Sequence, residues 1–240
     1  MTVGIPKEVK TDEFRVGATP FNVALLVEDG HSVLVQSAAG EGSGFNDALY
    51  RDAGAEIVES AESLYARASL IVKVKEPQPS EYALLSERHT LFCYLHLAPL
   101  PELVSLLAEK RVCAIAYETV TLGRELPLLK PMSEIAGKMA PSVASHHLSR
   151  YQGGEGVLMG GAVGVAPANL LIIGAGNAGF NAAKIAVGMG ADVTVLNRSA
   201  PKLVLLQKVL PHAKTAVYSP EALRELLPHA DVVVSTVLIH

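Results

Sequence analysis

Three glycines in the last third of the chain have the spacing of a loop that holds phosphate groups. Gly174, Gly176 and Gly179 form a G-x-G-x-x-G sequence, with Asn177 and Ala178 between the last two. In such a loop the first glycine permits a tight turn, the second lets the backbone approach a pyrophosphate, and the third lets a helix pack on a strand. The helix N-terminus then faces the phosphates with free N–H groups. The motif indicates dinucleotide binding, and the alternative is a tight turn that binds nothing.

Two apolar segments flank this motif at the distances that a βαβ unit requires. Residues 170–173 and 193–196 are predicted to be buried strands, and residues 178–189 form an amphipathic helix between them. A G-x-G-x-x-G sequence arises easily by chance in a chain with 20 glycines, so the flanking strands carry most of the argument. Their presence favours a Rossmann-type dinucleotide-binding domain.

The residues after the second of these strands bear on which dinucleotide fits. An acidic residue that binds the ribose is expected about 20 residues after the motif, but the chain has Asn197, Arg198 and, further on, Lys202. The asparagine can still hydrogen-bond a ribose hydroxyl, whereas the carboxylate that would repel a 2′-phosphate is missing and the two cations can attract one. NAD and NADP are therefore both open. The alternative is that Arg198 and Lys202 are solvated residues at the start of a surface helix.

A second group of candidate residues lies in the first hundred positions. Arg15 follows a short predicted strand, Lys75 ends an apolar strand at 70–75, and His96 follows another at 90–95. Ligands of an open α/β sheet bind beyond the carboxyl ends of its strands, so the three side chains are expected to converge on one crevice. Arg and Lys suit a carboxylate and His suits acid–base catalysis, which together fit an amino or oxo acid. Taken alone, His96 is more simply a solvated loop residue.

The overall composition is that of a globular α/β protein. Half of the 240 residues are hydrophobic, which suits parallel strands buried on both faces. The net charge of −4 and the lack of long basic runs give no support for nucleic acid as a partner. We find neither a run of strongly apolar residues long enough to span a membrane nor a signal-peptide segment, so we expect no membrane partner and a cytoplasmic protein. Cys93 and Cys113 lie in apolar runs without metal-ligand spacing, which predicts core residues in a reducing compartment and no metal site.

The order of the predicted elements divides the chain into two α/β domains. Residues 1–131 alternate strands with helices and form a flavodoxin-like or Rossmann-like substrate domain, in which Thr19 caps the first helix. A glycine loop at 38–44 lacks the phosphate-binding spacing and is interpreted as a connection. Residues 132–240 begin with a long linking helix at 132–151 and continue into the dinucleotide-binding domain. That domain has four predicted strands where a complete doubly wound domain has about six, so we expect it to be incomplete.

Seven segments, taken in order along the chain, resemble the alanine dehydrogenase family. They are GIPKEVKTDEFRV, LIVKVKEP, YLHLA, AIAYETV, PLLKPMSEIAGKMA, QGGEGVLMGG and IIGAGNAGFNAAKIAVGMGADVTVL. The α subunit of the proton-translocating transhydrogenase is a relative with a similar start and glycine motif, but the KVKEP and YLHLA stretches resemble alanine dehydrogenase more closely. The chain is identified as a member of this family that is truncated at its C-terminus.

This resemblance implies roles for individual residues. It implies that Arg15 and Lys75 bind the carboxylate and carbonyl of the substrate and that His96 is a catalytic acid or base. Further cofactor contacts are implied at Ser133, Asn177, Ala178, Asn197, Lys202, Ser219, Leu238 and Ile239. Family members usually have Asp where Asn197 stands, which puts the expected NAD preference in doubt. A second catalytic Asp and the last segment of the substrate domain would fall beyond His240, so neither is carried over.

The reaction implied by the resemblance is the reversible oxidative deamination of L-alanine by NAD⁺ and water to pyruvate, ammonium and NADH. Hydride would leave the α-carbon for the nicotinamide, and water would attack the resulting iminopyruvate while His96 exchanges protons. Two alternatives stay open, namely a truncated, inactive relative that binds nucleotide or a partner, and a transhydrogenase-like subunit. Family members are usually hexamers, so a homo-oligomer is expected, although its formation by this chain is open.

Overall fold

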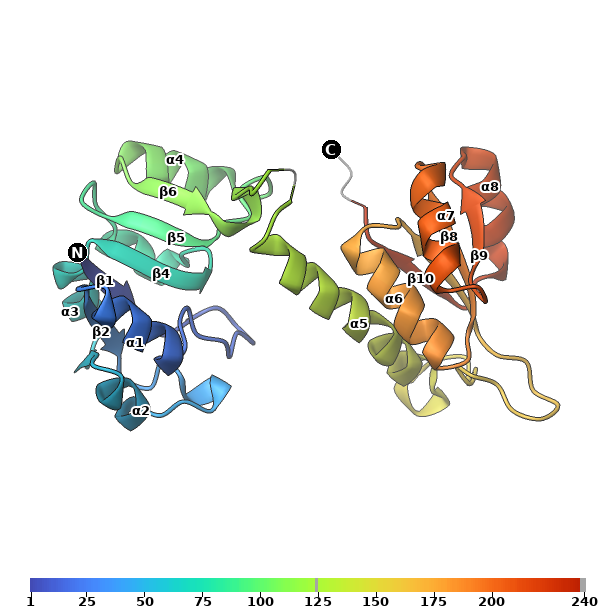
Figure 1. Ribbon diagram of the computed structural model, residues 1–240, viewed down its shortest axis with the longest axis horizontal. Coiled ribbons are helices and arrows are strands. Elements are labelled where there is room, and N and C mark those ends of the chain that lie inside the picture. Colours follow the sequence, from blue (N-terminus) through green and yellow to red (C-terminus); the bar gives the residue numbers. More distant parts are fainter. Residues whose placement is uncertain (124, 238–240) are drawn as a thin grey trace. The chain divides into compact units, whose positions relative to one another are not determined.

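The chain forms two compact units, Met1–Leu128 and Leu129–His240, drawn in Figure 1. The computed structural model describes residues 1–123 and 125–237. Each unit is a parallel α/β fold, as the sequence predicts. Within the described ranges, no helix is both long and apolar enough to cross a membrane.

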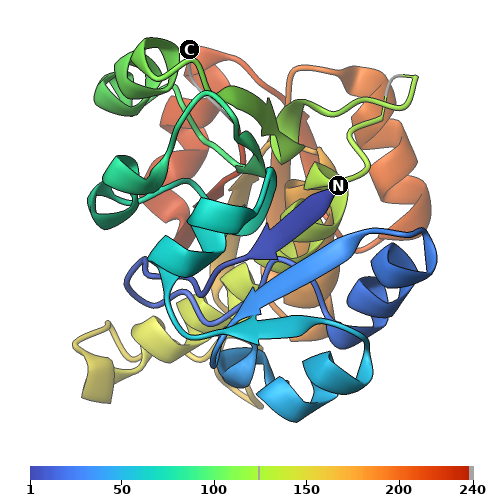
Figure 2. The same cartoon turned by 90° about the vertical axis from the view of Figure 1, so that its left-hand side faces the viewer.

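The first unit is built on a parallel sheet. Its described strands are β1 (Thr2–Ile5), β2 (Ser32–Gln36), β3 (Glu56–Val58), β4 (Leu70–Lys75), β5 (Thr90–Tyr94) and β6 (Cys113–Ala116), and its helices are α1 (Pro20–Glu28), α2 (Asp47–Asp52), α3 (Ala61–Arg67) and α4 (Pro101–Glu109), with 3₁₀ turns η1 (Glu41–Ser43), η2 (Pro79–Leu84) and η3 (Tyr117–Thr119). The strands lie in the order β3-β2-β1-β4-β5-β6, visible in Figure 2. The chain adds β2 and β3 on one side of β1 and β4 to β6 on the other, so the order reverses between β1 and β4. Such a reversal is where open α/β sheets bind ligands.

Two apolar clusters cover the two faces of this sheet. One cluster joins Val3 of β1 to Val23 of α1 and Tyr50 of α2. The other joins β4 and β5 to Leu64 of α3 and Leu103 of α4. Because successive side chains of a strand point to opposite faces, the buried runs of the sequence supply both clusters at once. The sheet is therefore fixed from both sides, and its strand ends are rigid supports for the loops that follow them.

The two cysteines have different environments. Cys93 is fully buried in the second of these clusters, as predicted. The same prediction for Cys113 is wrong, because its side chain is exposed. Cys113 starts β6, the outermost of the described strands on that side of the sheet, and Ala114 and Ile115 are exposed with it. An apolar run predicts a strand, but its position within the sheet decides whether the strand is buried.

The helix starts of this unit follow local chemistry. Thr19 caps α1 as predicted, since its side chain accepts a hydrogen bond from the Asn22 N–H and the Asn22 side chain accepts one from the Thr19 N–H. Pro20 follows at the first helical position, where its fixed φ suits a helix and its missing N–H is not needed. The strand β3 was not predicted, because three residues are too few to show an alternating pattern.

The second unit is a parallel sheet of the described strands β7, β8, β9 and β10 in the order β10-β7-β8-β9. Their bounds are β7 (Asn169–Ile173), β8 (Asp192–Asn197), β9 (Lys214–Val217) and β10 (Val232–Ser235), and the helices are α5 (Leu129–Leu148), α6 (Asn177–Gly188), α7 (Ala200–Val209) and α8 (Pro220–Leu226), with 3₁₀ turns η4 (Arg150–Gln152) and η5 (Leu227–His229). The helix α5 begins at Leu129, before the predicted residue 132, and Pro131 lies in its first turn, where a missing N–H costs nothing.

An apolar cluster of described residues fills this second unit. It contains Leu170 and Ile172 of β7, Val193 and Val195 of β8, and Ala183 of α6, all of which are essentially inaccessible to solvent. Small residues let α6 lie close to its neighbours, and this is clearest where it meets α5. A methyl group on Gly137 of α5 would lie 2.2 Å from the carbonyl oxygen of Ala178. The start of α6 is thereby fixed between the sheet and α5.

Candidate active site

The three polar residues predicted to form a substrate site follow neighbouring strands of the first sheet. β1, β4 and β5 are adjacent and parallel, so their carboxyl ends lie side by side. The loops that carry Arg15 and His96 begin at these ends, and β4 ends there in Lys75. Lys75 pairs in register with Tyr94, two residues before His96. Two of these three strands, β1 and β4, are the neighbours between which the strand order reverses. The structure thus brings the three elements together, in the place where such sheets bind ligands.

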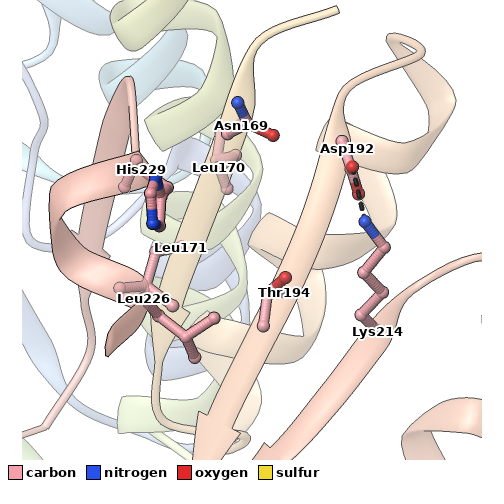
Figure 3. Close-up of a pocket in the computed structure, with 9 residues that line it drawn as sticks. Asn169, Leu170, Leu171, Asp192, Thr194, Lys214, Leu226 and His229 are labelled. Carbon is pink, nitrogen blue, oxygen red and sulfur yellow. Dashed lines mark hydrogen bonds and ion pairs between the residues drawn. The ribbon is translucent and has the colours of Figure 1, made fainter. Parts of the chain in front are cut away.

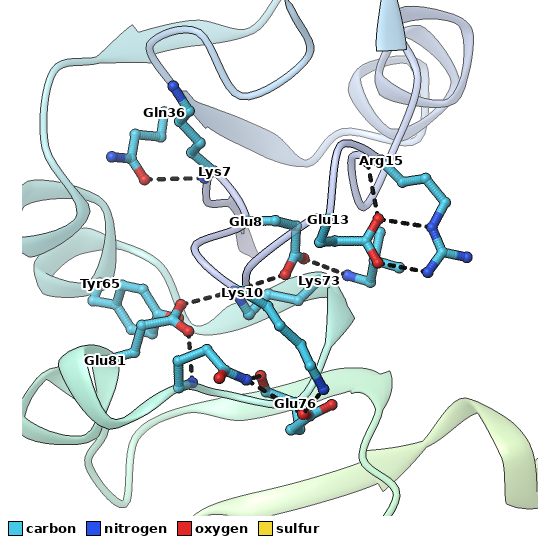
Figure 4. A network of polar contacts seen from close by, with 12 residues as sticks. Lys7, Glu8, Lys10, Glu13, Arg15, Gln36, Tyr65, Lys73, Glu76 and Glu81 are labelled. Atoms are coloured by element: carbon cyan, nitrogen blue, oxygen red, sulfur yellow. Dashed lines mark hydrogen bonds and ion pairs between the residues drawn. The ribbon is translucent and has the colours of Figure 1, made fainter. Parts of the chain in front are cut away.

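Arg15 is held by a carboxylate close to it in the sequence. Its Nε and Nη2 donate to the two oxygens of Glu13 at 2.8 and 2.6 Å, as Figure 4 shows. These hydrogen bonds hold the pKa of Glu13 below its ordinary value, and the nearby charge of Lys75 acts in the same direction. The effect of Lys75 on Glu13 places Arg15, Glu13 and Lys75 in one electrostatic neighbourhood. The pair also shows that the guanidinium can receive a carboxylate in the two-pronged geometry typical of arginine.

A buried ionic network supports β4 just before Lys75. The Lys73 side chain is fully buried, and its Nζ lies 2.7 Å from Oε1 of Glu81 and 3.3 Å from Oε2 of Glu8. Glu8 also accepts the backbone N–H of Val74 at 2.6 Å, and Glu81 accepts the hydroxyl of Tyr65 at 2.9 Å. Figure 4 shows how these side chains converge from the loop after β1, from α3, from β4 and from η2. The network ties the loop that leads to Arg15 to the strand that ends in Lys75.

His96 has an unusual backbone and a close carboxylate neighbour. Its φ is 45°, in the left-handed region that residues with a side chain rarely adopt. The His96 N–H donates to Oε1 of Glu118 at 2.6 Å, and the Leu95 N–H donates to Oε2 at 3.3 Å. Glu118 is in η3, directly after β6, and β6 pairs with β5. One carboxylate therefore bridges two consecutive amides at the start of the His96 loop.

An aromatic group lies beside this pair of residues. The ring of Tyr117 packs edge-on against Phe92 and Tyr94, with ring centroids 4.3 and 5.0 Å apart. The Tyr94 hydroxyl donates to the carbonyl of Leu128 at 2.5 Å. Burial raises the pKa of Tyr94, although the positive charge of Arg15 lowers it, and the carboxylate of Glu118 adds to the increase. Tyr94 thus lies within reach of both the Arg15 and the Glu118 charges.

The glycine turn of the second unit has the geometry that its spacing predicts. Gly174 has a φ of 111°, and its N–H donates to the carbonyl of Leu196 at 2.7 Å. Gly176 is the N-cap of α6 and has open space where a Cβ would stand. A Cβ on Gly179 would lie 1.9 Å from the Gly174 carbonyl oxygen. Each glycine therefore occupies a position where the turn, an open approach or a close backbone contact requires it.

The N–H groups at the N-terminus of α6 can donate hydrogen bonds to a ligand. Among the described residues no side chain caps it at Gly176, in contrast to Ser219, whose hydroxyl accepts the Ala222 N–H at 3.1 Å and caps α8. The first N–H groups of a helix lack partners within the helix and carry its positive dipole end. No described atom outside the neighbouring residues lies within 4 Å of the position that a Cβ of Gly176 would occupy. This open backbone fits the phosphates of a dinucleotide.

The residues at the end of β8 are already engaged within the protein. The Asn197 side chain accepts the Ala175 N–H at 3.1 Å and donates to the Ser199 carbonyl at 3.1 Å, so it braces the glycine turn. The Arg198 guanidinium lies 5.5 Å from the centre of the Tyr218 ring, in a cation–π arrangement. Lys202 is exposed in the first turn of α7, and Ser133 is half-buried near the start of α5. The predicted contacts at Leu238 and Ile239 lie outside the described residues.

A hollow in the second unit lies at the wrong end of its sheet for this chemistry. It lies at the amino ends of β7, β8 and β9 and is lined by Asn169, Asp192, Lys214, Leu226 and His229 among others, as seen in Figure 3. An ion pair joins Lys214 to Asp192 in its lining, at 2.6 Å. The glycine turn follows β7 at the opposite, carboxyl end. None of the predicted site residues that the structure describes lines this pocket.

The sequence alone did not predict a role for Glu118, for Glu13 or for the Glu8–Lys73–Glu81 network. Glu118 comes just after β6, so the rule that selected Lys75 and His96 applies to it as well. Glu13 is two residues from Arg15, a spacing that carries no signal of its own. Lys73 stands in the same alternating segment as Lys75, and the pattern does not show that one of them is completely buried.

The fold and the glycine turn together define the class of this protein. It is an α/β protein with two parallel-sheet units, and the second unit is of the Rossmann type. Two family models match within the chain, "Alanine dehydrogenase/PNT, N-terminal domain" over residues 4–136 and "Alanine dehydrogenase/PNT, C-terminal domain" over residues 140–240. The chain therefore belongs to the alanine dehydrogenase/PNT family.

Individual relatives agree with this assignment. Alanine dehydrogenase of Bacillus subtilis is 46% identical over 240 residues, which is all of this chain and 63% of the relative. Alanine dehydrogenase of Mycobacterium tuberculosis is 48% identical over 241 residues, again all of this chain and 65% of the relative. The chain thus spans slightly less than two thirds of the length of the curated relatives it matches.

Two solved structures are similar over nearly the whole chain. One is an L-alanine dehydrogenase, with a TM-score of 0.88 and 43% sequence identity. The matched region is 97% of this chain and 65% of the chain in that structure. The other is a transhydrogenase from Sinorhizobium meliloti, with a TM-score of 0.81 and 26% sequence identity. The matched region is 100% of this chain and 70% of the chain in that structure.

Proposed function

We propose that this chain takes part in the reversible, nicotinamide-dependent oxidative deamination of L-alanine to pyruvate and ammonium. The observation that carries the proposal is that Arg15, Lys75 and His96 follow three adjacent strands of one sheet, in a chain whose curated relatives are named alanine dehydrogenases. Because the chain spans less than two thirds of those relatives, turnover by the 240 residues alone is part of what has to be tested.

The first unit supplies groups suited to an amino or oxo acid. The Arg15 guanidinium would bind the substrate carboxylate through two N–H groups, and the substrate would take the place of the Glu13 carboxylate that they now bind. The Lys75 ammonium would bind the carbonyl oxygen and favour negative charge that develops there. His96 would take and return the proton that the nitrogen and oxygen exchange during hydration and loss of ammonium. An imidazole suits this step because it changes its protonation near neutral pH.

The second unit fits a nicotinamide dinucleotide. The open space at Gly176 and the uncapped N-terminus of α6 support phosphate binding by Asn177, Ala178 and Gly179, following the turn at Gly174. The family resemblance adds Ser133, Asn197, Lys202 and Ser219 as proposed contacts. When bound, the nicotinamide supplies hydride transfer, which no protein side chain can perform.

The choice between NAD and NADP rests on the end of β8. The Asn197 amide carries no charge that would repel a 2′-phosphate, and Arg198 is exposed beside Tyr218. We propose that the chain binds NAD and tolerates NADP. Fluorescence titration with NADH and NADPH tests this, and Asn197→Asp should weaken NADPH binding roughly tenfold or more through charge repulsion while NADH binding persists. If the unsubstituted chain binds NADH and shows no binding of NADPH, the proposed tolerance of NADP is wrong.

The main test of function is NADH formation from L-alanine by the purified chain, with His96→Ala alongside. Activity that depends on His96 supports the proposal. If the chain is folded but inactive, it should be fused to the C-terminal third of the Bacillus subtilis relative and assayed again. Activity only in the fusion supports the site and assigns turnover to the longer protein, whereas an inactive fusion that binds neither pyruvate nor NADH would refute the function. Light scattering in the same buffer tests the homo-oligomer expected from the family.

Two other functions are favoured by single observations. The similarity to the transhydrogenase structure supports hydride transfer between two nicotinamide nucleotides, which would show as reduction of an NAD analogue by NADPH without alanine. The uncapped N-terminus of α6 and the open space at Gly176 would by themselves serve a nucleotide-binding protein without turnover. In that case NADH would bind, and neither assay would give product even after fusion.

A further inference from the structure

We propose that Glu118 is the positioning residue for His96, and this inference rests on the proposed role of His96 in proton transfer. Glu118 is in η3 after β6, and His96 follows β5, the neighbouring strand. The carboxylate of Glu118 crosses from one strand end to the next and binds the backbone of the His96 loop. Its function is to set the direction in which the imidazole leaves the main chain.

The contact has the form of a two-pronged clamp on the backbone. Both oxygens of Glu118 accept an N–H group, from His96 at 2.6 Å and from Leu95 at 3.3 Å. Hydrogen bonds to an ionised acceptor are stronger than neutral ones. The preceding Leu95 side chain is buried in the core, so the clamp acts on a residue that is anchored on its other side.

The clamp coincides with a backbone conformation that needs support. The φ of His96 is 45°, which crowds its Cβ against the backbone. Such conformations persist where the surroundings over-determine them. If the two hydrogen bonds are lost, we expect the residue to relax to a negative φ. This rotation changes the Cα–Cβ direction, so the imidazole moves even though its own contacts are untouched.

The clamp is itself held in place. Tyr117, the residue before Glu118, packs edge-on against Phe92 and Tyr94 of β5. On the other side, the Thr119 hydroxyl donates to the Ala116 carbonyl at 3.0 Å and tightens the η3 turn. Since both neighbours of Glu118 are fixed, the carboxylate is presented to the His96 loop before any ligand arrives. Pre-organisation of this kind is what proton transfer at a defined distance requires.

The test compares Glu118→Gln and Glu118→Ala with Glu59→Gln in the 240-residue chain. Glu59 is exposed directly after β3 of the same sheet and serves as the matched control. The first readout is hydrogen exchange of the Leu95 and His96 amides by NMR. We expect exchange to be roughly tenfold faster in Glu118→Ala, an intermediate value in Glu118→Gln, which keeps one acceptor oxygen, and no change in Glu59→Gln.

A second readout separates positioning from a purely structural role. Pyruvate should perturb the His96 imidazole signal in the unsubstituted chain, and this response should be lost in Glu118→Ala while NADH affinity and the thermal midpoint stay unchanged. In an active protein kcat for L-alanine should fall at least tenfold, and Glu118→Gln should recover part of it. Unchanged amide exchange and an unchanged pyruvate response in both Glu118 variants would overturn the proposal. An unsubstituted chain in which pyruvate leaves His96 unperturbed would overturn the proposed function, while the exchange data still decide whether Glu118 fixes the His96 backbone.

Discussion

Gly179 is the residue whose replacement has the clearest consequence for the second unit. The position where its Cβ would stand is 1.9 Å from the carbonyl oxygen and 2.8 Å from the carbonyl carbon of Gly174. Both atoms belong to backbone that the turn holds in place, so they cannot move aside as a flexible side chain would. Gly188, near the end of the same helix, has nothing within 4 Å of its Cβ position.

We therefore predict opposite effects for alanine at the two glycines. Gly179→Ala should destabilise the second unit by about 1–3 kcal/mol, the usual cost of forcing an atom into a packed site, and should abolish NADH binding. Gly188→Ala should be neutral or stabilise by about 0.5–1 kcal/mol, because alanine loses less chain entropy in a helix. Urea denaturation and NADH titration of both variants give the comparison. Equal stability of the two would contradict the role of the third glycine.

Glu8 makes the stability of the first unit depend on pH in an unusual direction. Burial raises the pKa of Glu8 above its ordinary value of 4.5, against the opposing effects of the Lys73 charge and the Val74 N–H. The folded protein therefore holds this proton to a higher pH than the unfolded chain does. The corresponding contribution to stability is fully present below about pH 4.5 and is lost as the pH rises through the folded pKa.

Glu8→Gln should remove this pH dependence, since an amide does not titrate. The free energy of unfolding of the variant, relative to the unsubstituted protein, is expected to rise from pH 4.5 towards neutrality. Urea unfolding at a series of pH values measures the difference, with the exposed Glu59→Gln as the control. Parallel stability profiles for Glu8→Gln and the parent chain would show that burial of Glu8 has no such effect.

At the scale of elements, Lys73 is what ties β4 to the segments on either side of it. Its ammonium lies between the carboxylates of Glu8, in the loop after β1, and Glu81, in η2. Removing a charge from such a buried group leaves the remaining charges without compensation, which is far more costly than removing an exposed ion pair. The Arg67–Glu56 pair between α3 and β3 is of the exposed kind.

Lys73→Met keeps most of the side-chain volume and removes the charge. We predict a loss of about 3–5 kcal/mol in the free energy of unfolding, because two buried carboxylates lose their counter-charge. Arg67→Met, at the exposed pair, should leave the unfolding midpoint nearly unchanged. Thermal or urea unfolding of both variants is the measurement. A stable Lys73→Met protein would mean that the carboxylates take up protons at little cost.

The elements also show which features a sequence can reveal. The Thr19 cap and the glycine turn were predicted because their determinants lie within a few residues of each other, and the placement of Lys75 at the end of β4 follows from strand length. The burial of Lys73 and the exposure of Cys113 were not, because each depends on segments far away in the chain. Val74, for example, meets Glu8 across 66 positions. The clamp between Glu118 and His96 similarly requires knowledge that β5 and β6 are neighbours.

At the scale of the whole molecule, each unit has its own apolar core and its own candidate ligand. The first unit carries the residues suited to a small carboxylate, and the second carries the glycine turn. Both units match models of one family. A ligand that binds only the folded form of a unit stabilises that unit by mass action. Hydrogen exchange can therefore assign each ligand to its unit without any need for turnover.

We predict that pyruvate slows amide exchange within residues 1–123 and that NADH slows it within residues 129–237. At a concentration one hundred times its dissociation constant, a ligand adds about 2.7 kcal/mol, so amides that exchange through unfolding of the liganded unit should slow roughly a hundredfold. Mass spectrometry of peptic fragments measures the effect, and in Gly179→Ala the response to NADH should vanish while the response to pyruvate remains. Protection by NADH confined to residues 1–123 would contradict the assignment of the glycine turn as the dinucleotide site, because ligand contacts protect the backbone that makes them.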